Sequence, residues 1–151
     1  MSIKIICENR KAFYDYEILE KFEAGLVLVG SEVKSLRSGG GNLGDAYGVI
    51  SRNEAYLMHF HIAPYKQANL LNHEPLRTRK LLLHLQEINK LIGQTQEKGL
   101  TLIPLKLYFK KGRVKVELGL AKSKRKGDKR QSIRKKEADR EMERAIRAKR
   151  R

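Results

Sequence analysis

Two runs of alternating apolar residues, 101–109 and 114–120, most constrain the fold of this chain. Every second position takes part: Thr101, Ile103, Leu105, Leu107 and Phe109 in the first run, and Val114, Val116, Leu118 and Leu120 in the second. This period of two is typical of a strand that packs one face on a core, and Gly112 between the runs favours a turn. The pattern predicts a β-hairpin over residues 101–120.

Two earlier segments show the same alternation. Residues 14–22 lead through a turn at 23–25 to a second apolar run at 26–29, and residues 47–49 lead through a turn at 52–54 to an alternating run at 56–60. Each segment predicts a β-hairpin. The three hairpins would supply about six strands, which is a typical size for a sheet.

Helical spacing occurs in two places. Leu81, Leu85, Ile88 and Ile92 recur every three to four residues and predict a helix that stops near Gly93. A shorter helix is expected over residues 31–37. Short strands with one covering helix indicate a mainly β protein, either a closed or nearly closed antiparallel barrel or, as the alternative, a two-sheet sandwich.

Positive charge is concentrated towards the end of the chain. The formal net charge is +16, and residues 121–151 hold 15 of the 33 Lys and Arg but only 5 of the 17 Asp and Glu. After Leu120 only Ile133, Met142 and Ile146 offer large apolar side chains. We therefore expect a β-rich body over residues 1–121 and a basic tail over residues 122–151 that is disordered when free and helical when it meets a polyanion.

Composition and motifs narrow the class of function. A strongly basic chain favours phosphate partners, and its apolar runs are too short for a membrane span. The single Cys7 and the absence of a signal-like apolar segment at the N-terminus predict a cytoplasmic protein. No Walker A, GxSxG, HExxH or CxxC motif occurs, so no enzyme activity, cofactor or metal is expected. His59 and His61 lack a third ligand, which favours packing or RNA stacking over metal binding.

Basic clusters interleaved with amides, histidine and aromatics favour RNA as the partner. The candidate contacts are Asn9, Arg10, Lys11, Glu32, Lys34, Arg37, Tyr65, Asn72, His73, Arg77 and Arg79. The cations suit phosphates, and the other side chains can read base edges or stack on unpaired bases. Glu32 repels phosphate, so it either accepts from a base or hydroxyl or pairs with a neighbouring Arg.

Three other functions stay open on these residues alone. A general RNA-binding or ribosomal protein would have the same barrel and charge. An RNA-processing enzyme could use Glu32 and His73 as acid and base. An architectural DNA protein would bend duplex DNA and show little preference for a folded RNA.

A series of short segments then points to one family. In chain order they are ENRKA (8–12), YEILE (16–20), EAG (23–25), GSEVKSLR (30–37), IAPY (62–65), RKLLLH (79–84), KGLT (98–101), IPLKLY (103–108), GLAK (119–122) and DKR (128–130). Together these segments resemble the SmpB family, the SsrA-binding proteins of bacterial ribosome rescue. The resemblance spans nearly the whole body and is far more specific than any single motif.

The resemblance implies an OB-type, closed six-stranded antiparallel β-barrel with peripheral helices, which acts as a monomer and binds the tRNA-like domain of tmRNA, also called SsrA RNA. Protein and RNA together would mimic a tRNA. Elongation factor Tu would take part indirectly through the alanine-charged tmRNA. On a stalled ribosome the tail would occupy the decoding centre and the vacant mRNA channel, which leads to trans-translation, tagging of the incomplete product and ribosome release.

The resemblance also assigns residues to these two partners. It adds Lys122 and Lys124 to the tmRNA contacts named above. The ribosome-binding tail residues it implies are Asp128, Lys129 and Arg130 at the decoding centre, followed by Ile133, Lys135, Lys136, Arg140 and Arg144 in a basic helix. Gly127 stands where family members often carry an aromatic residue or histidine.

Overall fold

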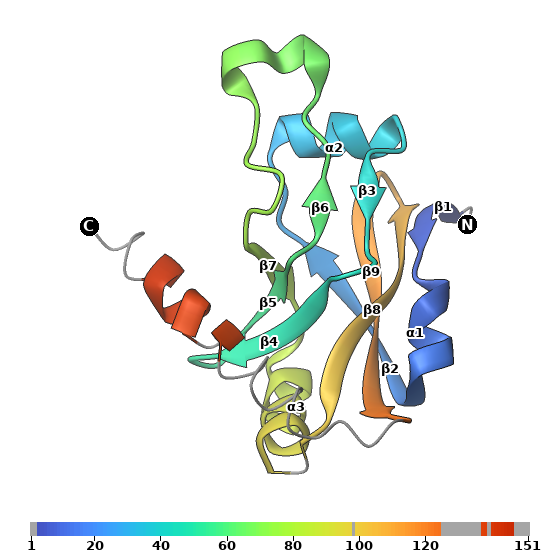
Figure 1. Cartoon of the computed structure of the whole chain (residues 1–151), viewed down its shortest axis with the longest axis vertical. Helices are drawn as coiled ribbons and strands as arrows, with labels where there is room; N and C mark the ends of the chain where they lie inside the picture. Colours follow the sequence, from blue (N-terminus) through green and yellow to red (C-terminus); the bar gives the residue numbers. More distant parts are fainter. Residues whose placement is uncertain (1–2, 98, 125–136, 139, 147–151) are drawn as a thin grey trace.

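The computed structural model describes residues 3–97, 99–124, 137–138 and 140–146 (Figure 1). The strands are β1 (Ile3–Glu8), β2 (Tyr16–Leu26), β3 (Gly41–Asn42), β4 (Tyr47–Ser51), β5 (Glu54–Met58), β6 (His61–Ile62), β7 (Arg79–Leu82), β8 (Thr101–Lys110) and β9 (Arg113–Ser123). The helices are α1 (Arg10–Asp15), α2 (Gly30–Arg37), the 3-10 helix η1 (Lys66–Leu71) and α3 (Leu85–Glu97). Residues 137–138 and 140–146 are also helical and are called the tail helix below.

Six strands close into a ring in the order β8, β4, β5, β7, β2 and β9, and β9 pairs back with β8. Every neighbouring pair in the ring is antiparallel. β1 pairs with the C-terminal half of β8, from Ile3 opposite Lys110 to Glu8 opposite Lys106, and extends the sheet beyond the ring. The predicted mainly β fold with a closed six-stranded ring and peripheral helices is confirmed, and the sandwich alternative is wrong.

Two of the three predicted hairpins are confirmed. β4 and β5 pair from Tyr47 opposite Met58 to Ser51 opposite Glu54, and their turn places Arg52 and Asn53 at φ values of 51° and 63°. β8 and β9 turn through Lys111 at φ 53° and Gly112 at φ 74°. Left-handed backbone at both central residues gives a turn whose twist matches that of the two strands.

The first predicted hairpin is wrong, because residues 16–26 form the single strand β2. Its apolar residues do alternate, with Phe22 and Ala24 buried, but the chain does not turn at residues 23–25. Gly25 pairs with Leu82 of β7, and a Cβ at Gly25 would lie 3.2 Å from the Cβ of Leu82. The glycine therefore permits two strands to approach closely, a use that local sequence cannot separate from a turn.

The predicted helix from Leu81 to near Gly93 is wrong at both ends, because α3 starts after Leu81 and continues past Gly93 to Glu97. Leu81 is buried in β7, where it pairs with Ala55 of β5, and α3 begins only at Leu85. A short apolar run such as RKLLL fits a buried strand as well as a helix by periodicity. From its corrected start, α3 buries Ile88 and Leu91 in the core at one end of the ring (Figure 1). The predicted helix over residues 31–37 is confirmed as α2.

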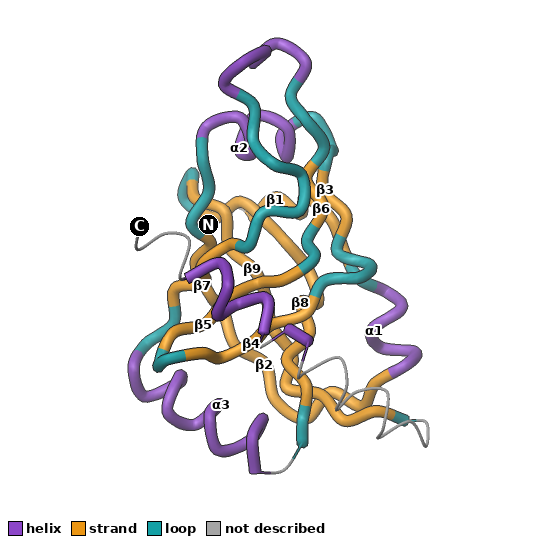
Figure 2. The backbone as a smooth tube through the Cα atoms, turned by 60° about the vertical axis from the view of Figure 1, so that its left-hand side comes forward, coloured by secondary structure: helices purple, strands orange, loops and turns teal. Residues whose placement is uncertain are grey.

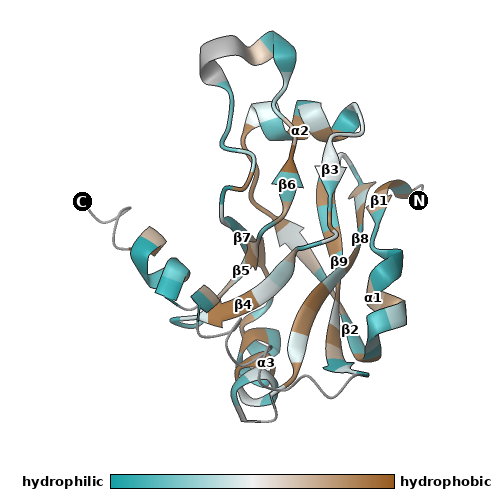
Figure 3. Cartoon of the chain, viewed as in Figure 1, coloured by the Kyte–Doolittle hydropathy of each residue, from teal (hydrophilic) through white to brown (hydrophobic). Residues whose placement is uncertain are grey.

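The core fills the ring, and hydrophobic residues follow β4, β5, β8 and β9 while α1 is mostly hydrophilic (Figure 3). No helix among the described residues is long and apolar enough to cross a membrane.

The β-rich body continues to Ser123, and the tail helix lies against β4 and β5 (Figure 2). The predicted disorder of the free tail over residues 122–151 stays a prediction, and residues 125–136, 139 and 147–151 of that tail lie outside the described residues.

Candidate nucleic-acid interface

Glu32 forms the centre of a buried ionic cluster beneath α2. Its side chain is 0% exposed, and its carboxylate accepts from Arg79 Nε at 2.5 Å and from Arg77 Nη2 at 2.7 Å. It also accepts from the Val29 amide at 2.9 Å, which satisfies a free N–H at the start of the helix. The alternative in which Glu32 pairs with neighbouring arginines is thus the one that the structure shows.

Arg79 is fully buried, and its guanidinium bonds to the Glu32 carboxylate and to two backbone segments. Besides Glu32, it donates to the carbonyl oxygens of Phe60, Pro75 and Glu74, with Nη2 3.2 Å from the Pro75 oxygen. The guanidinium carbon also lies 5.3 Å from the centre of the Phe60 ring. Arg79 therefore joins α2, β7 and the segment before it.

The two partners shift each other's protonation in opposite ways. Burial alone would raise the pKa of the Glu32 carboxyl, but hydrogen bonds from Arg77 and Val29 and the charge of Arg79 outweigh it and lower that pKa. Burial lowers the pKa of Arg79, and Glu32 opposes this change. Both groups stay charged at neutral pH, so the cluster is a structural ion pair.

His73 also bonds to the interior of the protein. Its Nε2 lies 2.8 Å from the carbonyl oxygen of Ile62, which can only accept, and its Nδ1 lies 2.8 Å from Ser31 Oγ. The carbonyl partner requires a hydrogen on Nε2, and in the neutral ring Nδ1 then accepts from the Ser31 hydroxyl. Since Glu32 and His73 both spend their polar atoms on internal bonds, neither is poised as the acid or base of an RNA-processing enzyme.

Asn72 closes the loop that carries η1. Its side chain both accepts from the Tyr65 amide at 3.0 Å and donates to the Tyr65 carbonyl at 2.8 Å. Lys34 of α2 places its Nζ 5.9 Å from the centre of the half-buried Tyr65 ring. The loop thus presents an aromatic face beside an exposed cation.

Lys34 and Arg37 of α2 are both exposed to solvent. Arg37 lies over the Phe109 ring, with its guanidinium carbon 5.6 Å from the ring centre. Neither side chain forms an ion pair with an acidic residue among the described part of the chain. Both charges are available to phosphates on the outer side of α2.

A second group of predicted contacts gathers around α1. Asn9 precedes the helix and is buried, with Nδ2 donating to the carbonyl oxygens of Pro104 at 3.1 Å and Leu43 at 3.4 Å. Arg10 and Lys11, by contrast, are exposed, and the Arg10 side chain is 92% accessible. Asn9 therefore anchors the segment that carries the two cations.

The end of β9 brings further cations to the same helix. β9 pairs with the start of β2, so that Lys122 lies opposite Glu17 and Ser123 opposite Tyr16. Lys124 donates from Nζ to the carbonyl oxygen of Phe13 at 3.1 Å, and both Lys122 and Lys124 are exposed. The exposed cations of α1 and of the end of β9 are together called the α1 cluster below: Arg10, Lys11, Lys122 and Lys124.

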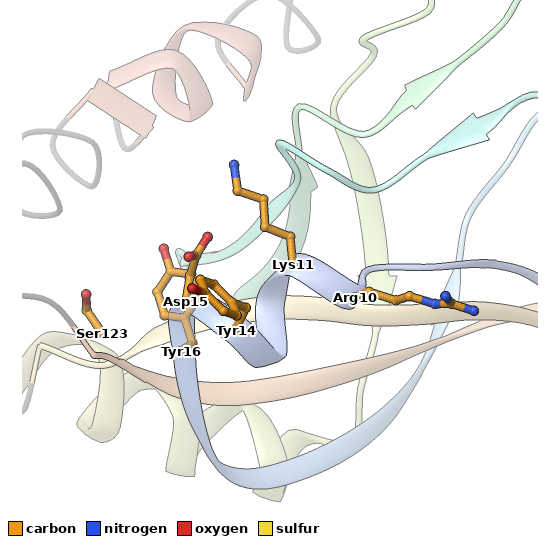
Figure 4. Close-up of a pocket in the computed structure, with 6 residues that line it drawn as sticks. All are labelled: Arg10, Lys11, Tyr14, Asp15, Tyr16 and Ser123. Carbon is orange, nitrogen blue, oxygen red and sulfur yellow. The ribbon is translucent and has the colours of Figure 1, made fainter.

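A pocket of about 630 Å³ opens beside this helix (Figure 4). It is lined by Arg10, Lys11, Tyr14, Asp15, Tyr16 and Ser123. The Tyr14 side chain is 76% exposed, which leaves an aromatic face open to solvent. Exposed aromatic rings next to cations suit unpaired bases and their phosphates.

The structure also places the remaining candidates. Arg140 and Arg144 are exposed on the tail helix. The other tail candidates lie outside the described residues: Asp128, Lys129, Arg130, Ile133, Lys135 and Lys136.

His59 and His61 do not share one strand, because β5 ends at Met58 and β6 begins at His61. No group of three metal-ligating residues occurs in the described part of the chain. Burial raises the pKa of the Cys7 thiol to about 11, so this cysteine is not an activated nucleophile.

Several residues of this surface were not predicted from the sequence. Ser31 holds His73, Ser35 Oγ donates to the Ala63 carbonyl at 2.6 Å, and Tyr14 and Tyr16 line the pocket. The serines carry no local signal, because their partners lie 42 and 28 residues away. The strand predicted from residue 14 onward places Tyr14 on a core face, so the sequence did not predict that this residue is exposed.

A closed β ring with exposed Lys and Arg on its peripheral helices defines a basic nucleic-acid-binding protein. The family model for the SmpB protein matches residues 6–148. The SsrA-binding protein of Syntrophobacter fumaroxidans is 60% identical over 141 residues, which cover 93% of this chain and 88% of that protein. The SsrA-binding protein of Geobacillus thermodenitrificans is 58% identical over 144 residues, covering 95% and 93% of the two chains.

A solved structure agrees with these relatives. A chain described under "tmRNA-SmpB: a journey to the center of the bacterial ribosome" superposes with a TM-score of 0.66 at 47% identity, covering 85% of this chain and 94% of that one. The chain belongs to the SmpB family. The family resemblance read from the sequence is confirmed.

Proposed function

We infer that this protein binds tmRNA and delivers it to stalled ribosomes in trans-translation. The observation that carries the inference is the match to the SmpB family over residues 6–148, together with relatives named SsrA-binding proteins that share 58–60% of its residues. The role is one of binding rather than catalysis. A cytoplasmic location, where ribosomes work, follows from it.

The tRNA-like domain of tmRNA is the partner of the body. The exposed cations of the α1 cluster, with Lys34 and Arg37, supply phosphate contacts, and Tyr65 offers a ring for stacking. Asn9, Glu32, Asn72, His73, Arg77 and Arg79 support this surface from within through the bonds described above. Charged tmRNA would bring elongation factor Tu into the same complex.

The tail acts on the ribosome. Asp128, Lys129 and Arg130 would reach the decoding centre, and the helix with Ile133, Lys135, Lys136, Arg140 and Arg144 would follow the vacant mRNA channel. The exposure of Arg140 and Arg144 supports this assignment, because a channel lined with phosphates requires accessible cations. Residues 1–121, joined by Lys122 and Lys124 at the start of the tail of residues 122–151, thus have a task separate from that of the rest of the tail.

A truncation tests this division of labour. A chain that ends at Lys124 keeps the whole ring and the α1 cluster, so it is expected to bind the tRNA-like domain within about twofold of the full chain, since the body supplies the phosphate contacts. Tagging of stalled products in a reconstituted translation reaction should be lost. Tagging by the truncated chain, or loss of RNA binding with the ring intact, would contradict the two-part function.

A further inference from the structure

The turn between β8 and β9 carries three cations that have no part in the function described above. Lys110, Lys111 and Arg113 surround Gly112, and these four residues are called the hairpin tip below. Lys111 and Arg113 are exposed, and Lys110 is half-buried. The stretch of residues 108–116 contains no acidic residue. The hairpin tip therefore concentrates positive charge at one end of the ring.

The backbone of the hairpin tip is held in one conformation by a two-residue turn. Lys110 pairs with Arg113, and Lys111 and Gly112 between them have φ values of 53° and 74°. Left-handed backbone at both central residues matches the twist of the two strands, so the turn continues the rigid hairpin. The backbone that carries these cations therefore loses little conformational freedom when a ligand binds, which favours binding.

The protein neutralises only part of this charge. Lys110 Nζ lies 3.3 Å from Glu23 Oε2. Lys111 and Arg113 form no ion pair with any acidic residue that the structure describes. Lys and Arg that neutralise phosphates displace the counterions of a nucleic acid, and this release supplies affinity. Two cations of the hairpin tip are therefore available to phosphates.

Phe109 connects the hairpin tip to α2. The guanidinium carbon of Arg37 lies 5.6 Å from the centre of the Phe109 ring, which directly precedes Lys110 in the chain. Phe109 also pairs with Lys4 of β1, which is exposed. In Figure 1 the turn between β8 and β9 lies below the C-terminal end of α2. The hairpin tip is thus next to a cation that already belongs to the proposed RNA surface.

The β4–β5 hairpin has the same kind of turn but a different charge. Its central residues Arg52 and Asn53 are exposed and have φ values of 51° and 63°. Glu54 follows directly, with Oε1 3.1 Å from Lys80 Nζ. Arg52 is thus a single cation beside a carboxylate. The turn geometry alone does not make a phosphate site, and the number of unpaired cations distinguishes the two hairpins.

We propose that the hairpin tip binds the phosphate backbone of the tRNA-like domain and extends the α2 surface of Lys34 and Arg37. Lys111 and Arg113 each neutralise a phosphate beyond those that α2 contacts. Phosphate contacts position an RNA without reading its sequence, so the tip fixes the orientation of the folded domain on the protein. The identity of this RNA rests on the proposed function, whereas the affinity of the tip for phosphates does not.

The salt dependence of RNA affinity tests this site in the full chain. Lys111→Asn combined with Arg113→Gln removes two charges, so binding of the tRNA-like domain should weaken about tenfold at about 150 mM salt. The slope of the logarithm of the affinity against that of the salt concentration should fall by about 1.5. Asparagine before glycine is the favoured sequence for this turn, so the urea midpoint should not fall.

The other hairpin supplies the matched control. Arg52→Gln removes an exposed cation from the same position of an equivalent turn. Its affinity for the tRNA-like domain should stay within about twofold of that of the wild type, with the same salt slope. A loss in Arg52→Gln as large as that in the double variant would show that net charge, and not the hairpin tip, sets the affinity.

Directed cleavage tests whether the hairpin tip lies against the RNA. In a Cys7→Ser background, an iron–EDTA group attached at Arg113→Cys should cut one region of the bound tRNA-like domain, because the group is held beside the RNA backbone. The same group at Arg52→Cys should leave that region intact. Equal cleavage from the two positions would overturn the contact.

The outcomes separate the hairpin tip from the proposed function. A double variant with the salt slope of the wild type would overturn the site on this RNA. If that variant binds the tRNA-like domain normally but tags stalled products more slowly, the tip contacts ribosomal RNA and the assignment to the tRNA-like domain is wrong. A wild type that binds ordinary tRNA as tightly as the tRNA-like domain would count against the proposed function instead, and the salt slopes would still decide on phosphate binding by the tip.

Discussion

The arginines beneath α2 and the cations around α1 look alike in the sequence but have different environments. Arg79 is fully buried and Arg77 half-buried, and both are bonded to the carboxylate of Glu32. Arg10 and Lys122 are exposed to solvent. The comparison teaches that burial decides the task of a cation: a buried one joins segments of the fold, and an exposed one remains available to phosphate.

The largest expected effect comes from removing a buried cation. Arg79→Met leaves the Glu32 carboxylate buried with one partner fewer, which should lower the free energy of unfolding by about 3–5 kcal/mol. Urea unfolding followed by circular dichroism measures this change. Arg10→Met, at an exposed position, should stay within about 0.5 kcal/mol of the wild type. Equal losses in the two variants would remove the distinction between the groups.

Acid should weaken the same cluster. The pKa of Glu32 is lowered in the folded state, so its stabilising contribution is complete above the unfolded pKa of about 4.3 and is lost as pH falls through the lower, folded value. Urea midpoints measured from pH 7 down to about pH 3 should fall in the wild type and fall less steeply in Glu32→Gln.

The stability of Glu32→Gln should still depend on pH to some extent, because Glu23 and Glu54 remain. Hydrogen bonds from Tyr108 and Tyr56 lower the pKa of these two carboxyls. Glu143→Gln, at an exposed position of the tail helix, serves as the matched control and should follow the wild type. If the urea midpoints of the wild type and Glu32→Gln fall by the same amount between pH 7 and about pH 3, the ionic cluster does not cause the loss of stability in acid.

Exposed cations should affect RNA affinity with little change in stability. Lys122→Gln combined with Lys124→Gln removes two charges beside α1, which should weaken binding of the tRNA-like domain about tenfold. The slope of the logarithm of the affinity against that of the salt concentration should fall by about 1.5. The free energy of unfolding should change by no more than about 1 kcal/mol, because the bond that is lost, from Lys124 Nζ to the Phe13 carbonyl oxygen, is at the surface. A large loss of stability with an unchanged salt slope would reverse the assignment of this group.

A single exposed charge should give the smallest effect. Arg10→Gln should weaken binding about threefold and reduce the salt slope by about 0.8, because one phosphate contact is lost. Filter binding at several salt concentrations measures both quantities. A loss above about thirtyfold would instead indicate that Arg10 reads a specific base through hydrogen bonds.

The sequence predicts strands well where the pattern and the turn chemistry agree. The β8–β9 and β4–β5 hairpins combine alternating residues with residues that accept left-handed backbone. The prediction is wrong at residues 23–25, where Gly25 serves the close approach of β7, and at Leu81, where the apolar run is a strand. Both errors depend on a distant partner strand that local periodicity does not encode.

The sequence supplies candidate site residues but not their arrangement. Basic residues and family motifs name the candidates, yet nothing in the sequence separates Arg79 from Arg37, because burial is a property of the folded ring. Glu32 is another example, because only the fold shows that its carboxylate bonds to Arg77 and Arg79.

The central claim is that this chain recognises one folded RNA through its exposed cations. A competition titration at about 150 mM salt compares the tRNA-like domain of tmRNA with ordinary tRNA and duplex DNA, for the wild type and for the variant that combines Lys122→Gln and Lys124→Gln. Our account predicts tight binding of the tRNA-like domain over both competitors by the wild type, and weaker binding by the variant. Equal affinity for all three nucleic acids would contradict it and reduce the chain to a general binder of polyanions.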